Sequence, residues 1–253
     1  MEKKNFKFAF LSGNVLKIIA VISMVIDHVG LMFFPHVIIM RRIGRLAYPI
    51  FAYMIAEGCK YTKNKTKYFG TIFLLGVIFQ LVYYVVERSL YMCIFITFST
   101  SILMIYALQN FKKQLFSNKS IVQTIIAFLI FACLVALVYM LNQKYVIDYG
   151  FWGCMLPVFV SLLHCDEKDE NQKLLQKIDC VPISVLTMSI GLVIFAYVLN
   201  KVNHFQYYSL YALPLLLLYS GKRGKYKMKY FFYVFYPAHL VALYAIQYLI
   251  NFL

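Results

Sequence analysis

Long apolar runs without formal charge constrain this chain more than any other feature of its sequence. Residues 68–86, 121–141 and 181–199 contain no Lys, Arg, Asp or Glu. The hydrocarbon core of a bilayer is about 30 Å thick, and a helix of about 20 apolar residues crosses it. Because backbone amides have no water to bind in lipid, each run is predicted to be helical.

Nine candidate spans follow from this pattern, which predicts an all-α, polytopic transmembrane bundle forming one domain over residues 1–253. The predicted spans are residues 15–34, 43–59, 68–86, 91–109, 121–141, 149–163, 181–199, 205–219 and 230–252. The sixth and eighth are the shortest. Hydrophobic residues make up 62% of the chain, above the roughly 45–50% of soluble domains, so lipid is the expected surroundings.

The distribution of basic residues predicts the orientation. Membrane proteins concentrate Lys and Arg in cytoplasmic loops. With a cytoplasmic N-terminus, all but six of the 25 basic residues fall on the inner side. An odd number of spans and an external C-terminus follow. A net charge of +15 can also indicate nucleic-acid binding, but we expect no nucleic-acid partner because no soluble basic domain is predicted.

Three of the six exceptions are Arg41, Arg42 and Arg45, in a predicted outer connection. Arginines placed against the charge bias are candidates for binding a substrate. The alternative is that they reach from a helix end to the membrane surface. The sequence leaves both interpretations open.

Ionisable residues within predicted spans are costly and are therefore functional candidates. In the first span, His28 shares a helical face with Lys17, about 16 Å nearer the cytoplasmic end. A cation at the inner end suits a phosphate-bearing ligand, and a histidine deep in the span suits proton transfer. The alternative is a structural polar contact at His28, with Lys17 at the interface.

Asp27 points to a different side of that helix from His28, because consecutive helical residues are about 100° apart. It therefore cannot orient the His28 imidazole. Arg45, at the outer end of the second span, is predicted at a comparable depth, which makes an Asp27–Arg45 pair plausible. Glu57 lies near the inner end of that span, within reach of Lys60, and is a substrate-binding candidate or an interfacial carboxylate.

Two further clusters are candidates. Tyr236 and His239 share a face near the middle of the last span, with either a structural or a cavity role. Asp148 and Tyr149 lie at the outer entrance of the sixth span, where Asp148 caps the helix or faces an acceptor. His36, His164 and His204 fall in loops and carry no signal. The six cysteines form no C-x-x-C pair, so neither a metal site nor a redox motif is expected.

Four blocks, in order along the chain, resemble the TraX family. They are residues 16–20 with 26–30, residues 44–53 with 57, 58 and 62, residues 148–150 with 153, and residues 232–240. The resemblance implies an integral membrane acetyltransferase of the bacterial cytoplasmic membrane, since TraX acetylates the N-terminus of F-type conjugative pilin. It also extends to the large integral-membrane O-acyltransferases, whose first span carries a histidine eleven residues after an arginine. Lys17 and His28 have that spacing here.

The resemblance further implies a mechanism. Acetyl-CoA is expected to dock from the cytoplasm with its phosphates near Lys17, Lys60 or Arg223, and His28 to act as the general base. The oxyanion donor is expected among Arg45, Tyr236 and His239. The acceptor, a peptide amino group or a glycan hydroxyl, is not identified by the sequence.

Two other function classes remain as alternatives. One is a proton-coupled transporter or channel, with Asp27, His28 and His239 as the proton relay. The other is a structural membrane partner without chemistry, which the intramembrane charges argue against.

Overall fold

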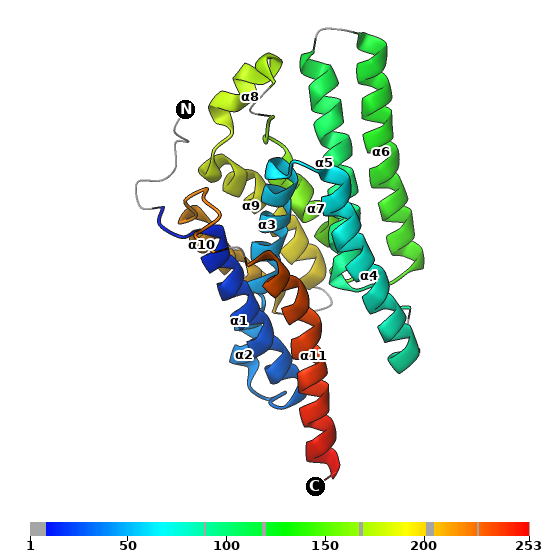
Figure 1. The fold of residues 1–253 in the computed structure, drawn as a ribbon, viewed down its shortest axis with the longest axis vertical. Coiled ribbons are helices and arrows are strands. Elements are labelled where there is room, and N and C mark those ends of the chain that lie inside the picture. The colour runs from blue at the N-terminus through cyan, green and yellow to red at the C-terminus, as the bar shows by residue number, and fades with distance from the viewer. Residues whose placement is uncertain are drawn as a thin grey trace. The chain divides into compact units, whose positions relative to one another are not determined.

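The computed structural model describes residues 9–88, 90–117, 120–166, 169–200, 205–226 and 228–252. Every regular secondary-structure element in these ranges is a helix, as predicted (Figure 1). The only β contacts found there are two isolated bridges. The chain forms two compact units, one of Met1–Phe51 with Leu192–Leu253 and one of Ala52–Gly191. Both boundaries fall inside helices. The prediction of one domain over residues 1–253 stays a prediction.

Six helices in the described ranges are long and apolar enough to cross a membrane. They are α1 (Gly13–Met32), α4 (Lys65–Glu87), α5 (Ile94–Phe116), α6 (Ile121–Lys144), α9 (Val181–Asn200) and α11 (Lys229–Phe252). Each coincides with a predicted span to within a few residues, except that α5 runs seven residues past the predicted end. The prediction of a multi-pass helical membrane protein is confirmed to this extent.

The other three predicted spans are shorter elements, so the count of nine is not confirmed. Residues 43–59 do not form one helix: α2 (Ile38–Gly44) ends before a turn at Arg45, and α3 (Ala47–Tyr61) begins after it. Pro49 lies in the first turn of α3, where a missing N–H costs nothing. Residues 149–163 hold α7 (Gly150–Ser161), and residues 205–219 hold the 3₁₀ helix η2 (Gln206–Tyr211) and α10 (Ala212–Leu217).

In the first unit, α2 and α11 both pack against α1 (Figure 1). The α1–α2 contact is close because two glycines lie in it. A Cβ on Gly30 would come within 2.7 Å of Met40 Cβ, and one on Gly44 would overlap the Asp27 side chain. These approaches leave no room for a larger residue, which fixes α2 against the C-terminal half of α1.

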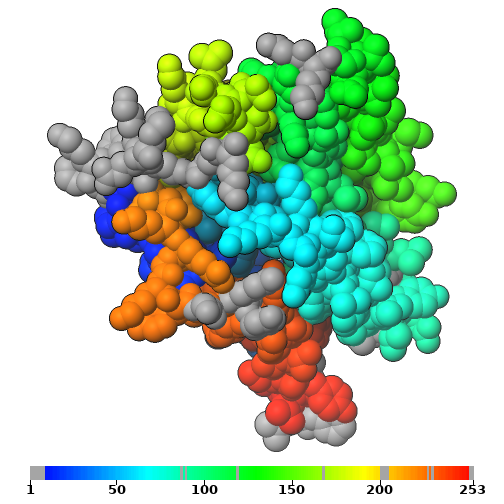
Figure 2. All heavy atoms as spheres, turned by 45° about the horizontal axis from the view of Figure 1, so that its top comes forward, coloured from blue at the N-terminus to red at the C-terminus, as the bar shows by residue number. Residues whose placement is uncertain are grey.

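In the second unit, α5 is the central helix and packs against α4, α6 and α7. Its partners α4 and α6 are largely exposed: only Ala127 and Val138 of α6 are buried, and Figure 2 shows the α4 side chains, in cyan, at the surface. Exposed apolar helices of this length are suited to lipid. The predicted long loop, residues 164–180, contains η1 (Glu170–Gln172) and α8 (Lys173–Ile178).

We predict that Gly44→Ala lowers stability by about 1–3 kcal/mol, the usual cost of inserting a carbon into a filled contact. The added methyl group would meet the Asp27 side chain. The measurement is the thermal unfolding midpoint in detergent, followed by circular dichroism. Gly70→Ala in α4 is the matched control, because no atom lies within 4 Å of its added Cβ. That variant should gain up to about 1 kcal/mol from helix propensity, and equal behaviour of the two variants would contradict the packing argument.

Candidate functional site

The two intramembrane histidines meet where α1 contacts α11 in the first unit. His28 Nδ1 and His239 Nε2 are 3.1 Å apart, and the ring centroids are separated by 5.0 Å. Near the start of α1, the Lys17 ammonium lies 5.6 Å from the centre of the Phe232 ring, which belongs to α11. Both contacts advance along the two helices in the same sense, so α1 and α11 run parallel.

A hydrogen-bond chain fixes the tautomer of both rings. His239 Nδ1 lies 3.1 Å from the Phe235 carbonyl oxygen, which can only accept, so Nδ1 carries the hydrogen in the neutral ring. His239 Nε2 then accepts from His28 Nδ1–H. His28 Nε2 is left with a lone pair, the form that a general base needs.

Aromatic side chains of α11 hold His239 in place. The Phe235 ring stacks on the His239 imidazole with 6° between planes, and Tyr236 packs edge-on against it at 5.5 Å between centroids. His239 is 8% exposed. Tyr236 and His239 therefore share a helical face, as predicted, and His239 on that face contacts His28.

The predicted Asp27–Arg45 pair is confirmed, and Arg41 joins it. Arg45 Nη2 is 2.8 and 3.0 Å from the two Asp27 carboxylate oxygens, and Arg41 Nη1 is 2.9 Å from Oδ1. Arg41 also donates to the Asp27 backbone carbonyl at 3.2 Å. As predicted, the Asp27 carboxylate does not orient His28: its contacts are with arginines, while His28 binds His239.

Arg42 has a different environment from Arg41 and Arg45. Its guanidinium carbon lies 4.9 Å from the centre of the Tyr208 ring in η2, a cation–π contact. Its Nε is shielded from solvent and has no acceptor among the described residues. The three arginines were predicted in an outer connection; the structure places Arg41 and Arg42 on the short helix α2 and Arg45 in the turn after it.

Basic side chains gather at the start of α1. The backbone amides of Gly13 and Asn14 donate to the carbonyls of Lys222 and Arg223 at 2.9 and 3.0 Å. This contact docks the basic segment 222–225 on the helix N-terminus. The positive φ of Gly224, 101°, allows the close turn. The segment that carries Arg223 thus lies against the first turn of the helix that carries Lys17.

Glu57 and Lys60 belong to the second unit, in a buried polar network. Lys60 forms an ion pair with Asp179, and each side chain is 4% exposed. Glu57 Oε1 lies 3.7 Å from His164 Nε2, which is 3.1 Å from Ser184 Oγ. Glu57 was predicted within reach of Lys60, and the structure gives Lys60 an ion pair with Asp179.

Two groups that sequence reasoning missed complete this network. The Lys112 ammonium donates to the carbonyls of Ser161 and His164 at the end of α7, a favourable place for a cation. Asp179 also accepts from the Cys165 amide at 3.0 Å. Burial raises the pKa of Asp179, but His164, Lys60 and this amide outweigh burial and hold the pKa below its usual 3.8. No local motif connects residues so far apart in the chain.

Asp148 does not cap α7, contrary to one of its two predicted roles. The N-cap position is Tyr149, with a φ of 61° and without a side-chain cap. The Asp148 carboxylate instead accepts from Tyr91 Oη at 2.6 Å, and its carbonyl accepts from Thr97 Oγ1 at 2.8 Å. Asp148 therefore fixes the turn before α7 within the second unit.

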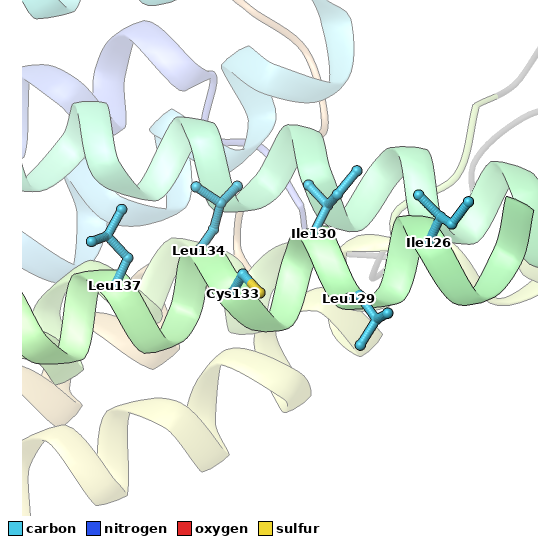
Figure 3. Close-up of a pocket in the computed structure, with 6 residues that line it drawn as sticks. All are labelled: Ile126, Leu129, Ile130, Cys133, Leu134 and Leu137. Carbon is cyan, nitrogen blue, oxygen red and sulfur yellow. The ribbon is translucent and has the colours of Figure 1, made fainter.

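An apolar groove on α6 contains none of the candidate residues. Figure 3 shows its lining, which is Ile126, Leu129, Ile130, Cys133, Leu134 and Leu137. All six side chains come from one exposed helix, so an acyl chain of the membrane is a suitable occupant.

The fold and the histidine pair define the class of this molecule: a multi-pass helical membrane protein with buried ionisable groups between its helices. The chain belongs to the TraX family, because residues 12–247 match the family described as TraX protein. The resemblance of the four sequence blocks is thereby confirmed.

Two curated relatives are similar to this chain. An uncharacterized protein of Rickettsia prowazekii is 44% identical over 68 residues, so the match covers 27% of this chain and a quarter (25%) of that relative. The probable fimbrial assembly protein FimC, serogroup H1, of Dichelobacter nodosus is 26% identical over 249 residues, 92% of this chain and 94% of the relative. No solved structure matches.

We predict that Asp179→Asn lowers stability by about 3–5 kcal/mol near neutral pH, because it leaves the Lys60 charge buried without a partner. The folded pKa of Asp179 lies below 3.8, so its contribution is complete above that pH and is lost as the pH falls through the folded pKa. Thermal unfolding of the wild type and the variant should therefore differ at pH 7 and converge in acid.

Two lysine substitutions, one at a buried and one at an exposed position, provide the control for this prediction. Lys60→Met should destabilise the protein, whereas Lys177→Met, on the exposed side of α8, should leave the unfolding midpoint nearly unchanged. A pH-independent difference between Asp179→Asn and the wild type would contradict the proposed role of the ion pair.

Proposed function

We propose that this protein is a membrane-embedded acetyltransferase that moves an acetyl group from cytoplasmic acetyl-CoA to an acceptor at the outer side of the membrane. The observation that carries the proposal is the hydrogen bond between His28 and His239, which leaves His28 Nε2 with a lone pair. Membership of the TraX family supports the acetyl group as the one transferred.

In the proposed step, His28 Nε2 takes the proton from the acceptor N–H or O–H as that atom attacks the thioester carbonyl. The tetrahedral intermediate then collapses, the carbon–sulfur bond breaks, and the proton passes from His28 to the leaving thiolate. The products are CoA and an amide or ester. His239 is a positioning residue here, since both of its ring nitrogens are engaged.

The donor is proposed to bind at the basic start of α1. The segment that carries Arg223 is docked on the first turn of α1, the same helix carries Lys17, and His28 lies about 16 Å beyond Lys17 along it. The CoA phosphates would be held at this end and the thioester directed toward His28. Lys60 is a weaker candidate than Lys17 and Arg223, because its ammonium is buried and paired with Asp179.

Tyr236 is the proposed oxyanion donor among the three candidates. It packs edge-on against His239, so it adjoins the histidine pair. Arg45 is committed to the Asp27 carboxylate and to the Arg41 carbonyl, and His239 to its two ring partners. A phenolic hydroxyl in a site shielded from water stabilises a developing negative charge.

A peptide amino group is the proposed acceptor. The relative named as a probable fimbrial assembly protein supports a pilin-associated role, in which Arg41 and Arg42 face the acceptor. A glycan hydroxyl is chemically equivalent in the step above. Glu57, Asp148 and Tyr149 are structurally engaged in the second unit, which favours support of the fold over substrate binding.

The N-terminus is proposed to lie in the cytoplasm and the C-terminus outside a bacterial cytoplasmic membrane. The parallel direction of α1 and α11 supports this, because two parallel spans at the ends of a chain require an odd number of crossings. Lys residues are concentrated in the segments predicted to be inner, and this bias indicates which side of the membrane is cytoplasmic.

The proton-relay alternative has less support. A relay from Asp27 to His28 needs the carboxylate to exchange protons with the imidazole, and the Asp27 carboxylate is held by Arg41 and Arg45.

We predict that His28→Ala abolishes acetyl transfer while leaving membrane insertion and folding intact, because the general base is lost. The measurement is incubation of the purified protein with labelled acetyl-CoA and cell-envelope extract, with identification of the labelled product. His36→Ala is the matched control, since His36 lies in an exposed turn and its loss should leave the rate unchanged. Full activity of His28→Ala would remove the mechanism.

We predict that His239→Phe lowers kcat by about 10²–10⁴-fold, the range for loss of a positioned general base. The KM for acetyl-CoA should stay nearly constant, because the donor phosphates bind at the other end of α1. His239→Gln should recover part of kcat, since an amide can donate to the Phe235 carbonyl and accept from His28. An equal loss in both variants, or a change in KM alone, would argue against the positioning role.

A further inference from the structure

We propose that Arg42, on its Tyr208 platform, binds a carboxylate of the acceptor, so that the acceptor is an acidic peptide. This proposal rests on the proposed function, because it names the acceptor of the same site. Arg42 is half-buried and has no carboxylate partner among the described residues. It lies on α2, which packs against the turn of α1 that carries Asp27 and His28.

The charge balance around α2 leaves positive charge uncompensated. Arg41 and Arg45 share the single carboxylate of Asp27. Arg42 forms no ion pair with any carboxylate of the described residues; its contact is the face of Tyr208. Three cations and one anion leave a local charge of about +2, and an unpaired arginine in a membrane protein is costly unless it has a ligand.

Unsatisfied donors indicate what kind of ligand fits. Arg42 Nε is shielded from solvent and has no acceptor in the described part of the chain. Gln206, 2% exposed and on the same η2 helix as Tyr208, has a buried amide nitrogen Nε2 that likewise finds no acceptor there. Buried N–H groups in folded proteins are normally satisfied, so two on the contacting elements α2 and η2 favour a ligand that supplies acceptor oxygens.

The position of Arg42 suits recognition of the acceptor rather than the donor. Arg41, its neighbour in α2, donates to the Asp27 backbone carbonyl, and His28 follows Asp27 directly. Lys17 and Arg223 lie at the opposite end of α1. A ligand held at Arg42 would thus approach His28 from the end away from the proposed CoA phosphates.

A carboxylate is the anion that this arrangement favours. The planar guanidinium binds carboxylates through paired N–H groups, and stacking on Tyr208 holds its plane. A peptide acceptor with an acidic side chain near its amino group supplies both the nucleophile and this anion. A neutral glycan supplies only the first.

The test uses full-length protein in nanodiscs of zwitterionic lipid and short peptides with a free amino group and an amidated C-terminus. Peptides carrying Glu at position 2, 3 or 4 are compared with the same peptides carrying Gln, and dissociation constants are measured by calorimetry. At least one Glu peptide should bind about tenfold tighter or more, as expected for a hydrogen bond to a charged group. Arg42→Gln should abolish that preference, and Arg42→Lys should retain part of it.

Arg88→Gln is the matched control, because Arg88 is an exposed arginine with the same kind of contact, 5.9 Å from the centre of the Tyr84 ring. It should keep the preference for Glu. Equal binding of every Glu and Gln pair to the wild type, or a preference that survives Arg42→Gln, would overturn the proposal. Stabilisation of the wild type but not of Arg42→Gln by phosphatidylglycerol, with equal peptide binding, would assign the site to a lipid headgroup and overturn it as well.

The binding test is separable from the proposed acetyl transfer. His28→Ala should keep the preference for the Glu peptide and lose transfer. If the wild type binds Glu and Gln peptides equally but still transfers acetyl to the Gln peptides, the result counts against the carboxylate role of Arg42 and not against acetyl transfer. Preferential binding without any transfer by the wild type would count against the acetyltransferase function and leave the carboxylate site standing.

Discussion

The cost of an ionisable group in an apolar helix decides how the first unit is built. Asp27 lies within a span whose other side chains are nearly all apolar, so its charge must be matched by side chains from elsewhere. Arg41 and Arg45 supply that match from α2 and the turn after it. The pair holds α2 against α1, and Gly30 and Gly44 permit the close contact on which this depends.

Two consecutive residues of α1 consequently have different roles. The helical turn of about 100° between Asp27 and His28 directs the carboxylate to the arginines and the imidazole to α11. The anchoring of α1 is therefore separate from the chemistry proposed for His28. The hydrogen-bond chain from the Phe235 carbonyl through His239 then selects the tautomer of His28 without the aspartate that usually performs this task.

The two units use their charges differently. In the second unit, Lys60 pairs with Asp179, Lys112 caps the carbonyls of α7, and Glu57 faces His164. These charges balance within the network, as expected of groups that hold loops and helix ends together. In the first unit, the arginines exceed the carboxylates, and Arg42 rests on an aromatic face. Excess charge of one sign is the pattern expected where a ligand of the other sign completes the site.

The sequence by itself determined the six long helices, because a helix in lipid satisfies its backbone within one continuous segment. It also indicated the Asp27–Arg45 pair, since both residues lie on consecutive segments at matching depth. Of the other three predicted spans, residues 43–59 are divided by a turn at Arg45, residues 149–163 hold the 12-residue helix α7, and residues 205–219 begin as a 3₁₀ helix. Only the tertiary structure decided that His28 meets His239, 211 residues away, and that Lys60 meets Asp179. Such pairs depend on which helices pack together, and hydropathy along one chain carries no information about that choice.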